Sequence, residues 1–381
     1  MSITEADSAT FEYGYDETDQ LVKEVRYDDL GDTVYGREYS YDPLGNRLVK
    51  EDLVSGDTVG YSYGADNRML SAGDISFSYD IGGNMVEKDD NGDTVAYEWD
   101  EGNNLSKVTL SDGTSMELTY DGDDIRASRT IDGEEVQFAW DPQSFNVVGE
   151  YDDLGQEDVA YGPQIGMDDP WVMMRESNAY FFQTDHLNSV TELTDENEAV
   201  QNEYRYKAFG EALQAVEMVE NEYQFTARRQ DGVDGIQFNR YRHYQAEFGR
   251  WNQWDIIRYD DGVNLYRYAN NNPNYYLDRD GTSIVGAVAV GVTVGTFLVG
   301  GTLAYIKARH AAKIAKGKRL RSRIRHSGSG AIPPSSMIDE LKDVRRTAPK
   351  AGKKAASAGG GVPGTSFSGP PPGGGPSPSC P

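Results

Sequence analysis

Apolar and polar residues alternate in short runs along residues 11–282 of this 381-residue chain. Phe77-Ser78-Tyr79 and Phe138-Ala139-Trp140 are examples, and turn-forming pairs such as Asn91-Gly92 separate the runs. A period of two is typical of strands with one buried face, and Asn-Gly favours tight hairpin turns. The pattern therefore predicts a mainly β chain made of successive hairpins.

One step recurs within this pattern: an aromatic residue precedes an acid, and a turn that often contains Gly-Asn then leads into an apolar residue. The copies are Tyr15-Asp16, Tyr41-Asp42, Tyr79-Asp80, Trp99-Asp100, Tyr120-Asp121 and Trp140-Asp141, with Tyr63-Gly64 as a degenerate copy. A hairpin of about 20 residues cannot bury its apolar face alone, so recurring hairpins are expected to stack into one curved sheet. An ordinary sandwich of unrelated strands is the alternative, and six copies of one pattern argue against it.

Composition narrows the function classes. The chain holds 63 Asp and Glu against 36 Lys and Arg, so nucleic-acid binding is not expected of the acidic β region. Cys380 is the single cysteine, which excludes an internal disulfide framework. The four histidines lie far apart without ligand spacing, so no metal site is predicted, and no cofactor is predicted either.

The end of the chain differs from the rest. Residues 284–306 carry no charge and, as a helix, are long enough to cross a bilayer. Fifteen of the 36 basic residues but only three acids follow residue 306. The first nine of those basic residues lie within 307–325, which favours a membrane flank over contact with nucleic acid. A segment hidden inside the β region is the alternative, and the Gly/Pro/Ser-rich remainder is expected to be disordered.

The repeated step resembles the YD repeat of the RHS (rearrangement hotspot) family of bacterial polymorphic toxins, to which the animal teneurins are related. Tyr41-Asp42-Pro43-Leu44-Gly45-Asn46-Arg47-Leu48 fits that repeat closely. Downstream motifs follow the order of the RHS repeat-associated core domain; they are Thr184–Val190 (with Asn188 in place of glycine), Tyr204–Gly210, Phe225–Arg229, Asn239–Tyr244, Phe248–Trp251 and Asn264–Pro273.

The resemblance implies a fold and a domain order. YD repeats at 11–165 would form part of a curved or spiral β-shell, and a core domain at 166–282 would cap it. A hydrophobic, transmembrane helix at 283–306 and a basic, mostly disordered tail at 307–381 would follow. A polar, acidic N-terminus without a signal peptide, together with few repeats, indicates a fragment of a longer RHS protein.

In the family, the core also resembles an aspartyl autoprotease that cuts after its own last motif. Asp255 and Asp278 match its catalytic pair, Arg250 matches an arginine that orients or balances charge, and the cut would fall between Thr282 and Ser283. Two close carboxylates that share a proton can hydrolyse a peptide bond. This chain lacks both prolines of the family motif, where Ile256 and Arg279 stand, and the leucine where Thr282 stands.

Three functions follow as hypotheses. The first is a shell fragment and core plug that presents or delivers a C-terminal cargo at the bacterial cell envelope, with the membrane and neighbouring RHS segments as partners. The second is self-cleavage that releases residues 283–381. The third is a surface module that binds carbohydrate or a cell-surface protein through its tyrosines, although tyrosines also pack hairpins. His186 is expected to be a core or turn residue, because no triad partners accompany it.

Overall fold

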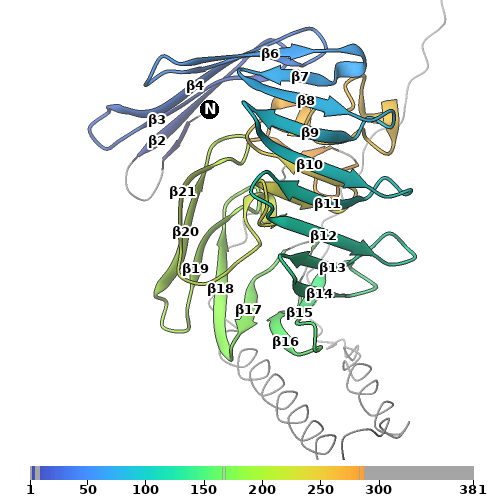
Figure 1. The fold of residues 1–381 in the computed structure, drawn as a ribbon. Helices are drawn as coiled ribbons and strands as arrows, with labels where there is room; N and C mark the ends of the chain where they lie inside the picture. The colour runs from blue at the N-terminus through green and yellow to red at the C-terminus, as the bar shows by residue number, and fades with distance from the viewer. Residues whose placement is uncertain (1, 5–8, 165, 168, 283, 287–381) are drawn as a thin grey trace, which may run out of the picture. The chain divides into compact units, whose positions relative to one another are not determined.

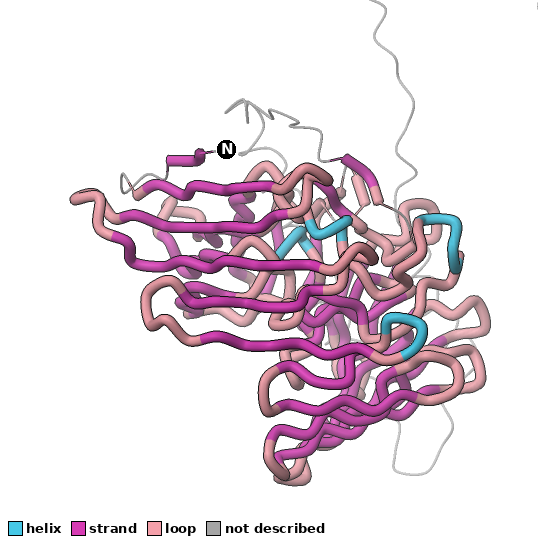
Figure 2. Tube along the Cα trace, turned by 90° about the horizontal axis from the view of Figure 1, so that it is seen from above, coloured by secondary structure: helices cyan, strands magenta, loops and turns pink. Residues whose placement is uncertain are grey.

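The computed structural model of the protein describes residues 2–4, 9–164, 166–167, 169–282 and 284–286. Strands and turns make up almost all of this part of the chain, with four single-turn 3-10 helices (Figure 2). Strands β1 to β21 form one sheet in which each strand pairs antiparallel with the next along the chain (Figure 1). This arrangement confirms the mainly β, stacked-hairpin prediction.

The strands of this sheet are β1 Ser2–Thr4, β2 Thr10–Tyr15, β3 Leu21–Tyr27, β4 Thr33–Tyr41, β5 Arg47–Asp52, β6 Thr58–Tyr63, β7 Met69–Ala72, β8 Ile75–Tyr79, β9 Met85–Asp90, β10 Asp93–Trp99, β11 Leu105–Leu110, β12 Ser115–Tyr120, β13 Arg126–Ile131, β14 Glu134–Trp140, β15 Val147–Tyr151, β16 Glu157–Tyr161, β17 Val172–Arg175, β18 Asn178–Thr184, β19 Val190–Thr194, β20 Val200–Tyr206 and β21 Ala212–Glu217. The helix η1, Ala65–Asn67, joins β6 to β7. The hairpin pairing continues past residue 166, the predicted start of the core domain.

Residues 222–282, here called the plug, form a compact second part. They contain a four-stranded and, with residues 285–286, a two-stranded antiparallel sheet. Their elements are η2 Phe225–Ala227, β22 Arg229–Gln230, β23 Ile236–Asn239, β24 Arg242–Gln245, β25 Arg250–Trp251, η3 Arg258–Asp261, η4 Ala269–Asn271 and β26 Tyr276–Leu277, which pairs with β27 Val285–Gly286.

The prediction of a hydrophobic helix at 283–306 is wrong for its first described residues. Val285 and Gly286 are extended and pair with Leu277 and Tyr276 of β26. Valine and glycine are weak helix formers, and strand pairing supplies their backbone partners here. The remainder of that segment, and the predicted disordered tail, lie outside the described residues. Within the described residues, no helix is long and apolar enough to span a bilayer.

Each aromatic–Asp step ends a strand with a β-bulge and a turn, which spans five residues in every step except Trp140-Asp141, where it spans six. In β10, the register shifts between Glu98 and Trp99, and Asp100 then accepts hydrogen bonds from the backbone N–H groups of Gly102 and Asn104, both 2.8 Å long. After Asp141 the residue with positive φ is Phe145. In the five-residue turns, the residue three positions after the acid takes positive φ, which glycine and asparagine tolerate best. Asn188 occupies that position with φ 68°, which explains why it can replace the family glycine.

The aromatic residue of each step joins neighbouring repeats. Its polar atom donates to the backbone carbonyl of the residue five positions after the acid of the preceding repeat. The pairs are Tyr41 to Leu21, Tyr63 to Arg47, Trp99 to Met85, Tyr120 to Leu105, Trp140 to Arg126 and Tyr206 to Val190, at 2.6–2.9 Å. The repeat aromatics are therefore used in stacking hairpins, as the packing interpretation of the tyrosines predicts.

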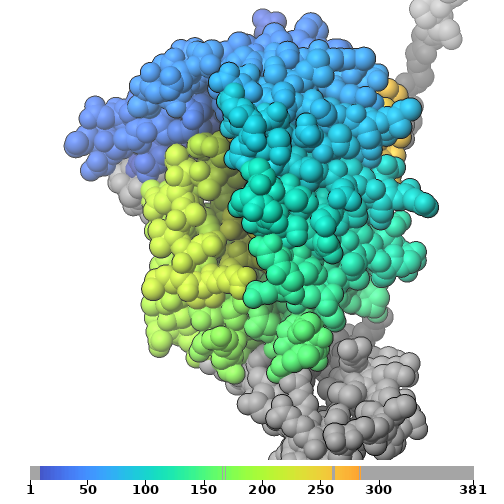
Figure 3. Space-filling model, in the orientation of Figure 1, coloured from blue at the N-terminus to red at the C-terminus, as the bar shows by residue number. Residues whose placement is uncertain are grey.

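The long sheet turns back on itself. The backbone N–H of Ala208, in the turn between β20 and β21, donates a 2.8 Å hydrogen bond to the buried Glu24 carboxylate of β3. The ring of Phe209 meets Tyr39 of β4 edge-to-face at 5.5 Å. The surfaces of β2–β4 and of β17–β21 accordingly lie side by side in Figure 3. This curvature gives the sheet a concave inner face, against which the plug packs.

Candidate functional site

Apolar contacts seat the plug on the inner face of the sheet. The Phe248 ring meets Phe77 of β8 edge-to-face, with ring centres 5.0 Å apart. Tyr223 meets Tyr161 of β16 in the same way at 5.0 Å. Val233 is buried in the same cluster as Phe77, so the core of the molecule is shared between the sheet and the plug.

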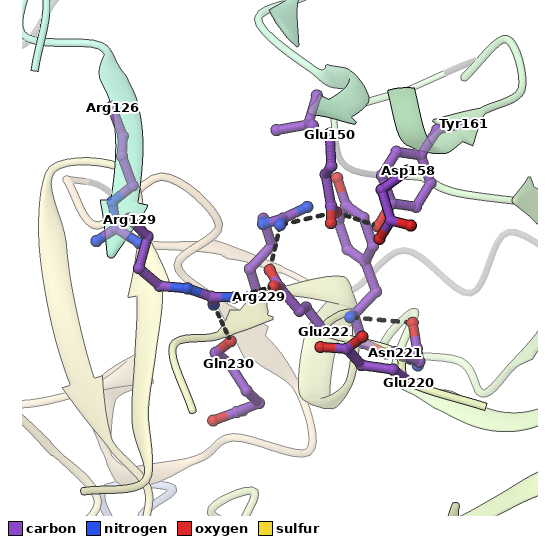
Figure 4. Close-up of polar contacts among 12 residues, drawn as sticks. Arg126, Arg129, Glu150, Asp158, Tyr161, Glu220, Asn221, Glu222, Arg229 and Gln230 are labelled. Carbon is purple, nitrogen blue, oxygen red and sulfur yellow. Dashed lines mark hydrogen bonds and ion pairs between the residues drawn. The ribbon is translucent and has the colours of Figure 1, made fainter. Parts of the chain in front are cut away.

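Buried ion pairs connect the plug to the sheet (Figure 4). Arg229 of the plug pairs with Glu150 of β15 at 2.9 Å and with Glu222, and Arg129 of β13 also pairs with Glu222. Arg126 of β13 pairs with Asp231. All of these side chains are less than a tenth exposed, so each charge depends on its partner. We call these six residues the ion seam; they are Arg126, Arg129, Glu150, Glu222, Arg229 and Asp231.

The two carboxylates beside Arg229 differ in their pKa. Burial opposes ionisation of Glu150, but the Arg229 charge and a 2.6 Å hydrogen bond from Tyr161 hold its pKa below the usual value. Burial raises the pKa of Glu222 despite Arg229, and the nearby charge of Glu150 adds to that rise. One guanidinium therefore supports two carboxylates that compete for it.

His243 lies beside the ion seam. Its Nε2 lies 2.8 Å from Nη2 of Arg126, and because arginine can only donate, Nε2 is the acceptor and the ring is neutral. Burial, followed by the charge of Arg126, lowers the pKa of His243 to about 3. The imidazole therefore stays neutral over the physiological pH range.

The structure brings Asp255 and Asp278 together through Arg242. One guanidinium nitrogen, Nη2 of Arg242, lies 2.8 Å from Oδ2 of Asp255 and 2.6 Å from Oδ2 of Asp278. The other face of this guanidinium stacks 4.1 Å from the ring centre of Trp251. All three charged residues are buried, each at most 4% exposed. Arg242 thus balances both carboxylates and fixes their spacing.

Asp278 also fixes the backbone before the expected cut. Its Oδ1 accepts hydrogen bonds from the N–H groups of Gly281 at 2.9 Å and of Thr282 at 3.0 Å, and Arg242 Nε donates to the carbonyl of Gly281. The two aspartates therefore lie at the point where the chain leaves the plug. Ser283, the other side of the expected cut, lies outside the described residues.

Arg250 lies at a different place. Its guanidinium donates to Asn46 Oδ1 at 3.0 Å and to the carbonyl of Asn67 at 2.7 Å, and so ties the plug to two repeat turns. The arginine that contacts both aspartates is Arg242, to which sequence reasoning assigned no role. Its only signal was its place in the Asn239–Tyr244 motif, because a buried arginine in a strand needs a carboxylate partner.

Comparison with known proteins identifies the family. The Teneurin YD-shell family profile matches residues 1–274. The chain belongs to this family. Its YD-shell is 27% identical over 280 residues to the tRNA nuclease WapA of Bacillus subtilis strain 168, a match that covers 70% of this chain but 12% of WapA. It is 25% identical over 373 residues to the toxin protein Tse5 of Pseudomonas aeruginosa, covering 74% of this chain and 28% of Tse5.

Solved structures resemble the YD-shell more remotely. A crystal structure of TcdB2-TccC3-Cdc42 aligns with a TM-score of 0.42 at 16% identity, covering 74% of this chain and 19% of that chain. The chain thus spans a small part of these relatives, 12% of WapA and 28% of Tse5.

Asp185 and His186 are adjacent residues of the YD-shell whose contacts are those of a turn. Asp185 caps its turn by accepting from the N–H groups of Leu187 and Ser189, both at 2.8 Å, and burial raises its pKa. His186 Nε2 lies 3.3 Å from the carbonyl oxygen of Asn274. Both therefore have turn and packing roles, as expected for His186. No group of three or more metal-ligating side chains that could hold an ion is found among the residues that the structure describes.

Proposed function

We propose that this chain is the plugged end of an RHS-type toxin shell that retains its C-terminal region, residues 283–381, and presents it for delivery to a membrane at the cell envelope. The ion seam carries the proposal, because it fixes the plug to the inner face of the sheet. Arg229 and Arg126 make these contacts across 79 and 105 residues of sequence. A retained plug provides a rigid point from which the C-terminal region starts.

Charge supports retention of that region. A cavity of about 460 Å³ opens at the inner face of β8–β11 next to the plug. Its charged lining consists of one lysine and five acids, which are Lys88, Asp90, Asp93, Asp112, Asp234 and Glu247. Lys88 is already paired with Asp234. The remaining acids complement the basic composition of residues 307–381.

A cleavage experiment tests retention. A site-specific protease sequence is inserted after Gly286 in the full chain, and the cut protein is passed over a gel-filtration column. We expect residues 287–381 to elute with the body in low salt. Immediate separation in low salt would refute retention. The same insertion with Arg229→Met tests the ion seam, since loosening the plug should release the fragment earlier.

Self-cleavage is a second candidate, favoured by the contact of Asp255 and Asp278 with one arginine nitrogen. In such a reaction, one carboxylate accepts a proton from water as the water attacks the Thr282 carbonyl. The other, protonated, gives its proton to the Ser283 nitrogen as the peptide bond breaks. Arg242 is ion-paired with both carboxylates, so this reaction requires Arg242 to leave one of them.

Electrophoresis of the purified chain tests this second candidate. Self-cleavage predicts a shortened wild type, while Asp255→Asn and Asp278→Asn stay at the full-length mass of 42.1 kDa. Asp153→Asn, in an exposed turn, serves as the control and should be cut like the wild type. A wild type that remains at full length would exclude the reaction.

A further inference from the structure

A short loop of the plug exposes an apolar surface. Ile256, Tyr259 and Val263 are 63%, 65% and 63% exposed, although the residues on either side of the loop are buried. Single exposed apolar residues are ordinary, but three large ones on eight residues form a patch that favours an interaction site. We call residues 256–263 the apolar loop.

The apolar loop is held in place at both ends. Arg258 has a φ of 60°, a left-handed conformation unusual for a residue with a side chain, and its guanidinium lies 4.7 Å from the ring centre of Trp254. At the other end, Asn67 Nδ2 donates a 3.3 Å hydrogen bond to the carbonyl of Val263. The loop therefore presents its apolar side chains from a fixed backbone.

The chain passes this loop again as it leaves the plug. Ile284 lines the same small cavity as Arg258 and Gly262 of the loop. Two residues later the described chain ends, and residues 287–306 then run without a charge. An uncharged segment and an exposed apolar surface thus begin next to each other, and each would lower its contact with water by covering the other.

We propose that the apolar loop is the docking surface for residues 287–306 before they enter a membrane. This inference rests on the proposed function, in which that segment is delivered to a bilayer. The occupant is a segment of the same chain because it starts beside the loop and requires no diffusing partner. The loop then acts as a reversible shelter that keeps the segment off other apolar surfaces until delivery.

Thiol labelling tests the docking. Val294→Cys is placed in the full chain with Cys380→Ser, and the rate of reaction with a hydrophilic maleimide is measured. We expect this reporter to react at least tenfold more slowly than Cys380 does in the unaltered chain. Ile256→Asn with Val263→Asn should restore the fast rate, whereas Leu30→Asn with Leu154→Asn, at other exposed turns, should leave it slow.

The outcomes separate this inference from the proposed function. A reporter that reacts quickly in every variant, or that stays slow when the loop is altered, overturns the docking. Vesicle flotation of the same proteins is read independently, and flotation of the wild type upholds delivery even if docking fails. A third result is that the reporter reacts quickly in every protein and the loop variant no longer floats with vesicles. In that case the loop itself contacts the bilayer, and the docking is overturned as well.

Discussion

The hydroxyl of Tyr120 donates a 2.9 Å hydrogen bond to the backbone carbonyl of Leu105, and so joins one repeat to the repeat before it. Burial raises the pKa of the Tyr120 hydroxyl, and its hydrogen bond to Leu105 is partly buried. The same bond recurs along the sheet, which makes it a unit of the stacking and not a local detail.

Tyr120→Phe tests the energetic value of this bond. It leaves the Leu105 carbonyl without its partner, so we expect a loss of about 1–2 kcal/mol in the free energy of unfolding, measured with urea. The exposed Tyr259→Phe is the control and should change stability by less than about 0.5 kcal/mol. Equal effects of the two substitutions would show that the recurring bond contributes nothing.

Arg229→Met tests the ion seam. The substitution leaves Glu150 and Glu222 buried without their shared cation. We therefore expect the free energy of unfolding to fall by about 3–5 kcal/mol. Arg175→Met is a matched control, because its partners Asp158 and Glu220 are 53% and 69% exposed and such pairs contribute about 1 kcal/mol or less. A small effect at Arg229 would mean that its ion pairs add little to stability and that the other contacts of the plug hold it in place.

His243 predicts a dependence of stability on pH. The folded ring stays neutral down to a pKa of about 3, while the unfolded ring takes up a proton below its ordinary pKa of 6.5. The stability that the neutral His243 contributes is therefore fully present above pH 6.5. Below that pH, the free energy of unfolding falls by about 1.4 kcal/mol per pH unit.

Urea unfolding between pH 7.5 and pH 5 checks this sign in wild type and in His243→Gln, whose side-chain oxygen can still accept from Arg126. The stability difference should shift in favour of the variant as the pH falls. Parallel curves for the two proteins would rule out the role given to His243.

The sequence predicted what local physics determines. Alternation and the aromatic–Asp turns were enough for the hairpins, because Asp42 and Asn46 act within one turn. The bond from Tyr120 to Leu105 was missed because alternation says which face is buried and not which atom an aromatic side chain reaches.

The contacts of the site could be predicted only in part. Asp255 and Asp278 could be named from motif order, but their link through Arg242 depends on how β24 packs in the plug. The partners of Arg229 lie 7 and 79 residues away, and nothing in the local pattern distinguishes Glu150 from the other acids of the sheet. Arg250 shows the same limit, since its partners Asn46 and Asn67 belong to distant repeats.

Vesicle flotation in high salt tests the central claim, delivery of the C-terminal region to a membrane, most directly. The full chain is mixed with phosphatidylcholine–phosphatidylglycerol vesicles, and salt removes simple attraction of the basic tail. We predict that wild type and Leu154→Lys float, while Val294→Lys with Leu298→Lys stays at the bottom, because charges in the apolar segment oppose insertion. A wild type that stays at the bottom, or a charged variant that floats equally well, would contradict the account.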